Sequence, residues 1–236
     1  MESKKIALVT GGNTGIGLEI VRGLLRAGCR VYVGAREVAK GQQAVATLAA
    51  EGEALAIELD LTNQTTLDAA AARVRREVGH LDILVNNAGI NVAGDGLPGT
   101  ATAHSVGQVM KTNFLGTLAV TQAFLPLVKQ APAGRIVNLS SPLGSLTLSG
   151  QHDWGLLGYS ASKAALNMLT VQLAYELRDT AIKVNSAAPG YTATALNDFA
   201  GTDTPEQGAA EAIRLALLPA DGPTGTASAS TGVLPW

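Results

Sequence analysis

Short apolar runs alternate with longer amphipathic segments along the chain. The short runs are bounded by turn residues, a pattern that predicts β-strands. They cover residues 6–10, 30–34, 54–59, 83–85, 135–139 and 182–186. Each is followed by a segment whose apolar residues recur at helical spacing. These predicted helices cover residues 16–26, 37–50, 64–78, 104–129, 159–178 and 205–218.

The first of these helices has the clearest pattern. Ile16, Ile20 and Leu24 recur at intervals of four and define one apolar face. Gly28 follows the last turn, at the position where helices often end in a left-handed residue. Asn63 precedes the third helix and is an expected N-cap.

The strict order of strand and helix predicts an α/β fold, a doubly wound parallel sheet of the Rossmann type with helices on both faces. The 236 residues contain no linker, repeat or charge run, so we expect one domain over residues 1–236. The tail, residues 222–230, is rich in Gly, Ser, Thr and Ala. It is compatible with a weak last edge strand or with a loose end.

Composition narrows the class of protein. The 17 basic and 19 acidic residues give a net charge of −2, which argues against a nucleic-acid partner. Cys29 is the single cysteine, so an intramolecular disulfide is excluded, and the isolated His80 and His104 suggest no metal site. No apolar run is long enough to span a membrane, and the start lacks a signal sequence. We therefore expect a soluble cytoplasmic protein without a membrane partner.

A glycine-rich turn, Thr10-Gly11-Gly12-Asn13-Thr14-Gly15-Ile16-Gly17, joins the first strand to the first helix. Glycine lets the backbone turn sharply and approach a ligand closely. The helix N-terminus then offers free N–H groups and a partial positive charge to a pyrophosphate. This context favours a dinucleotide site over an ordinary βα turn.

Tyr159 and Lys163 are four residues apart, so they share one face of a predicted helix. An ammonium beside a phenol favours the phenolate, so we expect Lys163 to lower the pKa of Tyr159 and prepare it for acid–base chemistry. Taken alone, the pair is more typical of a surface tyrosine and a solvated lysine at the start of a helix.

Together these motifs resemble the short-chain dehydrogenase/reductase family. The glycine spacing is G-x-x-x-G-x-G, and Asn86-Asn87-Ala88-Gly89 is similar to the N-N-A-G motif of that family. Residues 159–163 match Y-x-x-x-K, and residues 189–194 match P-G-x-x-x-T. The stretches 110–117 and 35–37 are similar to the carbonyl reductase branch.

The resemblance implies a role for each catalytic residue. Tyr159 would donate a proton to the carbonyl oxygen, and Lys163 would bind the nicotinamide ribose. Ser141 would hydrogen-bond the substrate oxygen, with Ser140 as its rival, because the family uses the second serine of such a pair. Asn113 would hold a water in a proton relay to Lys163.

The same resemblance assigns the cofactor contacts. Thr194 and Thr192 would contact the nicotinamide carboxamide, and Asp60 would lie near the adenine. The full set of expected cofactor-binding residues is Gly11, Asn13, Thr14, Gly15, Ile16, Gly17, Arg36, Asp60, Leu61, Asn87, Ala88, Gly89, Tyr159, Lys163, Pro189, Gly190, Thr192 and Thr194.

The end of the second strand bears on cofactor choice. An acidic residue there would bind the ribose 2′-hydroxyl of NAD(H). This chain instead has Ala35 followed by Arg36, whose planar guanidinium suits a phosphate. NADP(H) is therefore favoured over NAD(H). Thr14, where NADP-dependent relatives often have a basic residue, and the nearby Glu37 point the other way.

The segment between Ser141 and Tyr159 is a few residues longer than in typical relatives and far shorter than in animal carbonyl reductases. We expect it to cover the substrate. The expected substrate pocket consists of Ser141, Trp154, Leu156 and Tyr191, whereas His152 is read as a solvated loop residue. The region after Thr194 is short, which suggests an open pocket that accepts varied ketones.

The sequence thus predicts NADPH-dependent reduction of ketones and aldehydes, with a small carbonyl compound as partner. One alternative is a catalytically silent dinucleotide-binding regulator, which would have lost Tyr159, Lys163 or the serine. Another is an alcohol dehydrogenase that prefers NADH. A homo-oligomer is compatible with the sequence.

Overall fold

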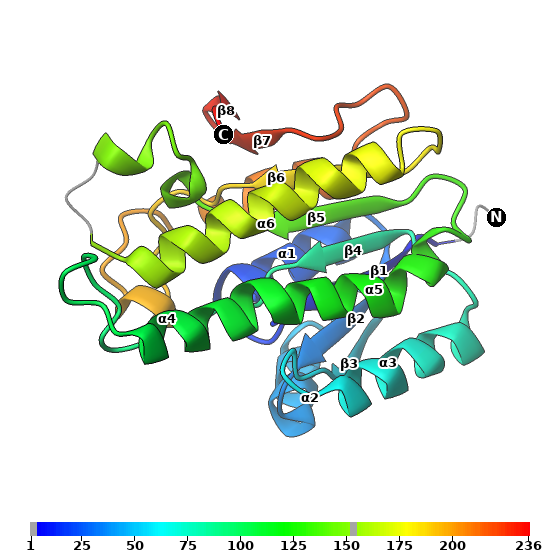
Figure 1. Cartoon of the computed structure of the whole chain (residues 1–236). Coiled ribbons are helices and arrows are strands. Elements are labelled where there is room, and N and C mark those ends of the chain that lie inside the picture. Colours follow the sequence, from blue (N-terminus) through cyan, green and yellow to red (C-terminus); the bar gives the residue numbers. More distant parts are fainter. Residues whose placement is uncertain (1–3, 152–154) are drawn as a thin grey trace.

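A computed structural model describes residues 4–151 and 155–236 and contains one central sheet. The sheet has eight strands in the order β3-β2-β1-β4-β5-β6-β7-β8 (Figure 1). Neighbours from β3 to β7 are parallel, and β8 is antiparallel to β7. The strands are β1 Ile6–Thr10, β2 Arg30–Ala35, β3 Ala54–Glu58, β4 Ile83–Asn86, β5 Arg135–Leu139, β6 Lys183–Ala187, β7 Ala227–Ala229 and β8 Gly232–Leu234.

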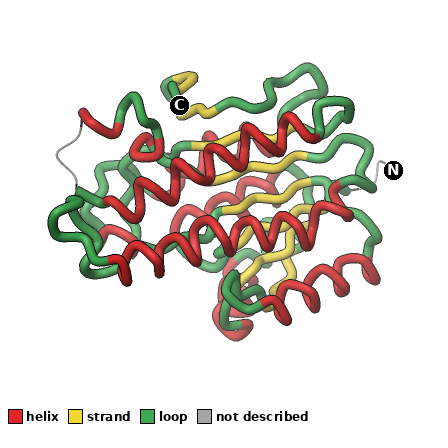
Figure 2. Tube along the Cα trace, viewed as in Figure 1, coloured by secondary structure: helices red, strands yellow, loops and turns green. Residues whose placement is uncertain are grey.

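Helices cover both faces of the sheet, so that the strands lie between two helical layers (Figure 2). One face carries α1 (Gly15–Arg26), α2 (Val38–Thr47) and α7 (Pro205–Ala216). The other face carries α3 (Gln64–Glu77), α4 (Ala103–Met110), α5 (Thr117–Val128) and α6 (Leu157–Glu176). The predicted doubly wound α/β fold is confirmed. No helix in the described part of the chain is long and apolar enough to cross a membrane.

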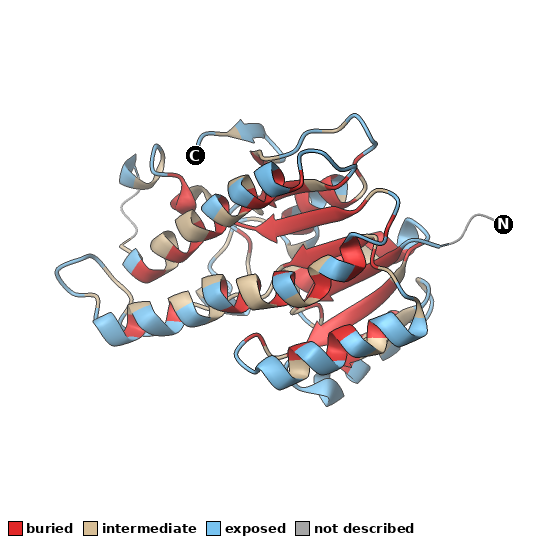
Figure 3. Ribbon diagram, turned by 45° about the vertical axis from the view of Figure 1, so that its right-hand side comes forward, coloured by how far each residue is buried: buried red, intermediate tan, exposed pale blue. Residues whose placement is uncertain are grey.

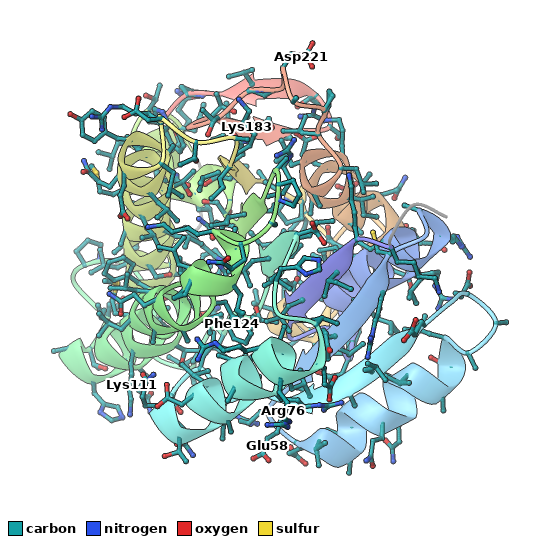
Figure 4. The ribbon with its side chains drawn as sticks, turned by 90° about the vertical axis from the view of Figure 1, so that its right-hand side faces the viewer. Glu58, Arg76, Lys111, Phe124, Lys183 and Asp221 are labelled. Carbon is teal, nitrogen blue, oxygen red and sulfur yellow. The ribbon has the colours of Figure 1, made fainter. Side chains whose placement is uncertain are left out.

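Two apolar cores flank the sheet. Leu8 of β1 points into the core beneath α3, α5 and α6, whereas its neighbours Ala7 and Val9 point into the core beneath α1 and α7. A strand buried on both faces needs an unbroken apolar run, which explains the sequence of β1. Figure 3 shows the central strands as buried. In Figure 4, Phe124 of α5 is labelled between Glu58, at the end of β3, and Lys183, at the start of β6.

Most predicted element boundaries agree with the structure to within a few residues. Gly28 has the left-handed φ of +85° expected after α1. Asn63 caps α3 by accepting a hydrogen bond from the Thr65 N–H. The predicted single helix over residues 104–129 is wrong in detail, because the π-helix Lys111–Gly116 separates α4 from α5. The apolar pattern continues through this segment, so the sequence did not reveal the change of helix type.

The tail forms two strands. β7 pairs with β6 through Ala227 and Ser228, so the edge-strand reading of residues 222–230 holds and the loose-end reading is wrong. β8 then adds an antiparallel strand at the outer edge of β7, which the sequence analysis missed. Beyond β8, the Trp236 carbonyl accepts a hydrogen bond from the Thr147 hydroxyl at 3.0 Å. The end of the chain therefore contacts the segment between Ser141 and Tyr159.

A buried polar network holds α6 against the sheet. Asn138 of β5 donates to the Thr170 hydroxyl of α6 at 2.8 Å, and that hydroxyl also contacts the Ser186 hydroxyl of β6 at 2.9 Å. One turn nearer the site, Ser140 donates to the Asn167 side chain at 2.6 Å. Buried polar groups are stable only when they are hydrogen-bonded, so this network fixes how α6 lies on the sheet.

Candidate active site

The glycine-rich turn at the carboxyl end of β1 is shaped for close backbone approach. Gly11 and Gly15 have φ angles of +61° and +54°, which favour glycine. A Cβ atom on Gly17 would lie only 2.2 Å from the Gly11 carbonyl oxygen, so no side chain fits there. Within the described residues, Thr14 precedes α1 without a side-chain capping hydrogen bond. The Thr14 side chain therefore does not occupy the N–H groups at the start of α1, which is where helices bind anions.

Asn87 ties this turn to the end of β4. Its side-chain amide donates to the carbonyls of Thr10 and Gly11 at 2.9 and 3.2 Å. The Thr10 hydroxyl in turn accepts from the N–H groups of Asn87 and Ala88 at 3.0 and 2.9 Å. These bonds bring the carboxyl ends of β1 and β4 together, where the strand order of a doubly wound sheet reverses.

Asn113 lies in the π-helix, a type of helix that often occurs at functional sites. Its side chain bonds both backbone groups of Ile90, accepting from the N–H at 2.8 Å and donating to the carbonyl at 2.9 Å. It also donates to the Ser162 hydroxyl at 3.1 Å. Asn113 thus connects the segment after β4 to α6, close to Tyr159 and Lys163.

The two serines after β5 have different environments. Ser140 is buried and donates to Asn167, so its hydroxyl holds α6 in place. Ser141 begins the 3-10 turn Pro142–Gly144, accepting from the Leu143 N–H at 3.2 Å, and it is hydrogen-bonded to Tyr159. The geometry therefore favours Ser141 for contact with a substrate oxygen.

Tyr159 and Lys163 share one face of α6, as their spacing predicts. The Lys163 ammonium lies 5.4 Å from the centre of the Tyr159 ring. It is nearly buried and donates to the Leu139 carbonyl at 2.7 Å. A Cβ on Gly144 would come within 2.7 Å of the Lys163 backbone, so this glycine permits the close contact between α6 and the turn after Ser141.

Burial governs the pKa values of this pair. It raises the pKa of Tyr159 to about 12, against a smaller lowering effect from the hydrogen bond with Ser141. It lowers the pKa of Lys163 to about 8. The expected lowering of the Tyr159 pKa by Lys163 is therefore wrong for this structure, because loss of hydration around the phenol outweighs the other effects. A phenol with a raised pKa keeps the proton that a general acid must donate.

These residues surround one cavity of about 680 Å³. The predicted site residues that line it are Gly11, Asn13, Thr14, Gly15, Ile16, Gly17, Asn87, Ala88, Gly89, Ser141, Leu156, Tyr159, Lys163, Pro189, Gly190, Tyr191, Thr192 and Thr194. Asn113 lies behind the wall, 3.5 Å from where a Cβ on Gly89 would be. Trp154 and His152 lie outside the described residues.

Three expected cofactor-binding residues lie away from this cavity. Arg36 is exposed directly after β2. One oxygen of the Asp60 carboxylate accepts from both the N–H and the hydroxyl of Thr62 at 2.8 Å. Leu61 packs under Gly116, where a Cβ would lie 2.8 Å from the Leu61 side chain. The cavity thus covers the part of the site around Tyr159 and the glycine-rich turn, and not its outer end.

The sequence analysis missed several residues of the cavity wall. They are Ile90, Asn91, Leu139, Pro142, Leu143, Ala195, Leu196 and Asn197. Each lies within a few residues of a recognised motif, at the carboxyl ends of the strands. Ligands of doubly wound sheets bind along this edge, so position after a strand was the one signal that could have identified them.

Comparison with known proteins identifies the family of this chain. Residues 5–204 match the family model of the short chain dehydrogenases. The chain is 35% identical over 263 residues to the short-chain dehydrogenase/reductase ATR10 of Stachybotrys chlorohalonatus, which covers 99% of this chain and 95% of that protein. It is 34% identical over 280 residues to human carbonyl reductase [NADPH] 1, covering 98% of each chain.

A solved structure gives the same picture. The Pseudomonas aeruginosa RhlG/NADP active-site complex superposes with a TM-score of 0.86 and 30% sequence identity, covering 97% of this chain and 95% of that chain. The chain therefore belongs to the short-chain dehydrogenase/reductase family. Within that family it is an oxidoreductase of the carbonyl reductase type.

Proposed function

We propose that this protein reduces ketones and aldehydes with NADPH, and that Tyr159 donates the proton. The observation that carries the proposal is the convergence of Tyr159, Ser141 and Lys163 with the glycine-rich turn on one cavity. A catalytically silent binding protein would have no need to keep this constellation. The carbonyl reductase relatives support the same reading at the level of reaction class.

The residues of the cavity fit a dinucleotide. Gly17 leaves no room for a side chain beside the Gly11 carbonyl, so the backbone alone forms the wall at the N-terminus of α1. We propose that a pyrophosphate lies here, and that residues 189–194 and Lys163 hold the nicotinamide half. NADPH, when bound, supplies the hydride.

Tyr159 and Ser141 act on the carbonyl oxygen of the substrate. Ser141 positions and polarises this oxygen by a hydrogen bond. As the carbonyl carbon accepts the hydride, negative charge develops on the oxygen, and the Tyr159 hydroxyl donates its proton there. Lys163, 5.4 Å from the ring centre, stabilises the phenolate that remains.

The proton on Tyr159 must then be replaced. Gly89 separates Asn113 from Lys163, because a Cβ there would lie 3.5 Å from the Asn113 side-chain oxygen and 3.7 Å from the Lys163 ammonium. The two polar groups thus flank one small space that a larger residue would fill. We propose that the proton relay from Lys163 passes through this space.

Arg36 sets the preference for NADPH in this proposal. It is exposed directly after β2, and its planar guanidinium suits a 2′-phosphate. Glu37, the rival ligand for a ribose hydroxyl, pairs with Lys40 at 2.6 Å, and this contact holds the pKa of Glu37 below its usual range. The names of the carbonyl reductase [NADPH] relatives point to the same cofactor.

The substrate is a neutral carbonyl compound. Lys163 is the one charged residue among the described residues that line the cavity. Ile90, Leu143, Leu156 and Leu196 give the rest of the wall an apolar character. Such a wall favours uncharged aryl and alkyl ketones or aldehydes over keto acids and sugar phosphates.

The decisive experiment is a panel of ketones and aldehydes assayed with NADPH and with NADH, following nicotinamide absorbance. We expect consumption of NADPH with several neutral carbonyl compounds and a lower kcat/KM with NADH. Binding of NADPH without turnover of any compound would favour the silent binding protein. A higher kcat/KM with NADH would favour the NADH-preferring alcohol dehydrogenase.

A further inference from the structure

The first turn of α6, which carries Tyr159, is bonded to a distant loop. Within the described residues, Leu156 precedes α6 without a side-chain capping bond. The Asp95 carboxylate instead accepts from the Gly158 N–H at 2.7 Å with one oxygen and from the Tyr159 N–H at 2.8 Å with the other. The Leu157 N–H donates to the Gly96 carbonyl at 2.9 Å. Three consecutive N–H groups are thus satisfied from the loop after β4.

Asp95 is itself held against α4. The Gly94 carbonyl, next to it in the chain, accepts from the Ser105 hydroxyl at 2.7 Å. Ser105 and Thr102 form the capping box that begins α4. The loop therefore links the start of α4 to the start of α6, and Asp95 is the side chain that makes the link to Tyr159.

Gly158 makes this contact possible. A Cβ on Gly158 would lie 3.0 Å from the Val106 Cα atom of α4 and 3.3 Å from each oxygen of the Asp95 carboxylate. The first turn of α6 therefore packs tightly between α4 and Asp95, and a side chain at position 158 would be crowded. Movement of Asp95 would release the backbone from which the Tyr159 side chain extends.

We propose that Asp95 is a positioning residue that fixes the first turn of α6 so that the Tyr159 hydroxyl is aligned with the substrate oxygen. The inference rests on the proposed function. Asp95 lies outside the cavity wall, so it acts through Tyr159 and does not touch the reacting atoms. Its negative charge also complements the positive end of the α6 dipole, which favours the same arrangement.

Replacement of Asp95 tests whether it aligns Tyr159 or contributes to binding of NADPH. Asp95→Ala removes both acceptors, and we expect kcat to fall by about 10- to 100-fold, since small misplacements of a catalytic group cost that much. The Kd for NADPH should change less than about two-fold, because Asp95 contacts none of the proposed cofactor residues except Tyr159. Asp95→Asn keeps one acceptor oxygen and should recover part of the loss. Asp68→Ala is the control, since the bond of Asp68 with Gln64 is exposed on α3.

A spectroscopic readout makes the test independent of turnover. Fluorotyrosine is incorporated, and the Tyr159 resonance is assigned by its absence in Tyr159→Phe. We expect Asp95→Ala to shift and broaden this resonance while the Tyr175 resonance stays in place, and Asp95→Asn to give an intermediate shift. If the alanine variant does not fold, the asparagine variant carries the same test.

The possible failures are distinct. An unchanged kcat and an unchanged Tyr159 resonance in Asp95→Ala would overturn the proposal and leave Asp95 as an ordinary helix cap. Equal losses in kcat and NADPH affinity would overturn it as well, in favour of general disruption. A wild-type protein that reduces no carbonyl compound contradicts the proposed function, and the Tyr159 resonance then decides the role of Asp95 by itself.

Discussion

The two ends of the proposed cofactor site differ in how their side chains are held. At the catalytic end, Lys163 is 5% exposed and bonded to a backbone carbonyl, and Tyr159 is bonded to Ser141. At the outer end, Arg36 is exposed, and the pair of Glu37 and Lys40 has side chains that are 52% and 57% exposed. The groups proposed to perform the chemistry are thus held by hydrogen bonds in or beside the core, whereas those proposed to select the cofactor lie in solvent.

This difference determines how each end responds to substitution. A buried group that loses its partner leaves an unpaired polar atom, and its neighbours cannot move freely to compensate. An exposed charge acts through water and salt, so its removal changes affinity by a limited amount. We therefore expect large changes in kcat at one end and moderate changes in KM at the other.

The largest effect is expected at Tyr159. Tyr159→Phe keeps the ring and removes the hydroxyl, so reduction should fall by at least the ~10²-fold typical of loss of a general acid. Binding of NADPH, measured by fluorescence titration, should persist. Near-normal turnover in this variant would refute the proposed proton donor.

Lys163 should affect both chemistry and binding. Lys163→Ala removes the charge that stabilises the phenolate and the proposed ribose contact, so we expect kcat to fall by roughly 10²-fold. The Kd for NADPH should rise in the same variant. Titration and steady-state kinetics measure the two effects separately, and an unchanged Kd would contradict the ribose contact even if kcat falls.

Arg36 tests the exposed end. A charge-assisted hydrogen bond is worth roughly 1.5–3 kcal/mol, so Arg36→Ala should raise the KM for NADPH by about 10- to 100-fold. The KM for NADH should stay nearly constant, because NADH has only a hydroxyl at that position. Arg76→Ala, at an exposed arginine of α3, is the matched control.

The measurement is kcat/KM for both cofactors on one ketone. Asp in place of Ala35 or Arg36 should reduce the preference further, because a carboxylate repels the phosphate and accepts from the 2′-hydroxyl. If the unmodified protein already prefers NADH, Glu37 becomes the better candidate for the ribose ligand and the assignment of Arg36 is wrong.

The smallest effect concerns stability and pH. Burial lowers the pKa of Lys163 to about 8 from 10.5, so between these values the unfolded chain binds more protons than the folded chain. The free energy of unfolding should therefore rise with pH across this window, relative to Lys163→Met. Tyr159 acts in the opposite direction only above pH 10, since burial raises its pKa to about 12.

Thermal unfolding of wild type and Lys163→Met at several values between about pH 8 and pH 9.5, the lower part of that window, checks this expectation. The difference in Tm between the two proteins should change steadily with pH. Lys111→Met, at an exposed lysine labelled in Figure 4, controls for loss of a charge. If the difference in Tm between wild type and Lys163→Met stays constant with pH, the lowered pKa of Lys163 is wrong.

Features encoded by local spacing could be predicted from the sequence. Gly11, Gly15 and Gly17 identify the turn. Gly11 and Gly15 have a positive φ, and Gly17 has no room for a Cβ atom. Tyr159 and Lys163 identify a helix face because four residues separate them. In both cases the information lies within one short segment, so no knowledge of distant contacts was needed.

Features that depend on contacts between distant segments could not be predicted. Asp95 accepts hydrogen bonds from the first turn of α6, which is more than sixty residues away in the sequence. No motif in the segment around Asp95 predicts this contact. The raised pKa of Tyr159 follows from its burial among neighbours that come from separate segments of the chain. The pairing of β8 with β7 depends on an edge that exists only once the sheet has formed.

The contact between Trp236 and Thr147 has a practical consequence for work with this protein. Thr147 lies in the segment that joins Ser141 to α6, so a peptide added after Trp236 would start beside that segment. The opposite end of the described chain enters β1 at its amino edge, away from the carboxyl edge where the site lies (Figure 1). Purification tags and surface linkers attached there start away from the cavity, so this end is the better choice for assays of substrate preference.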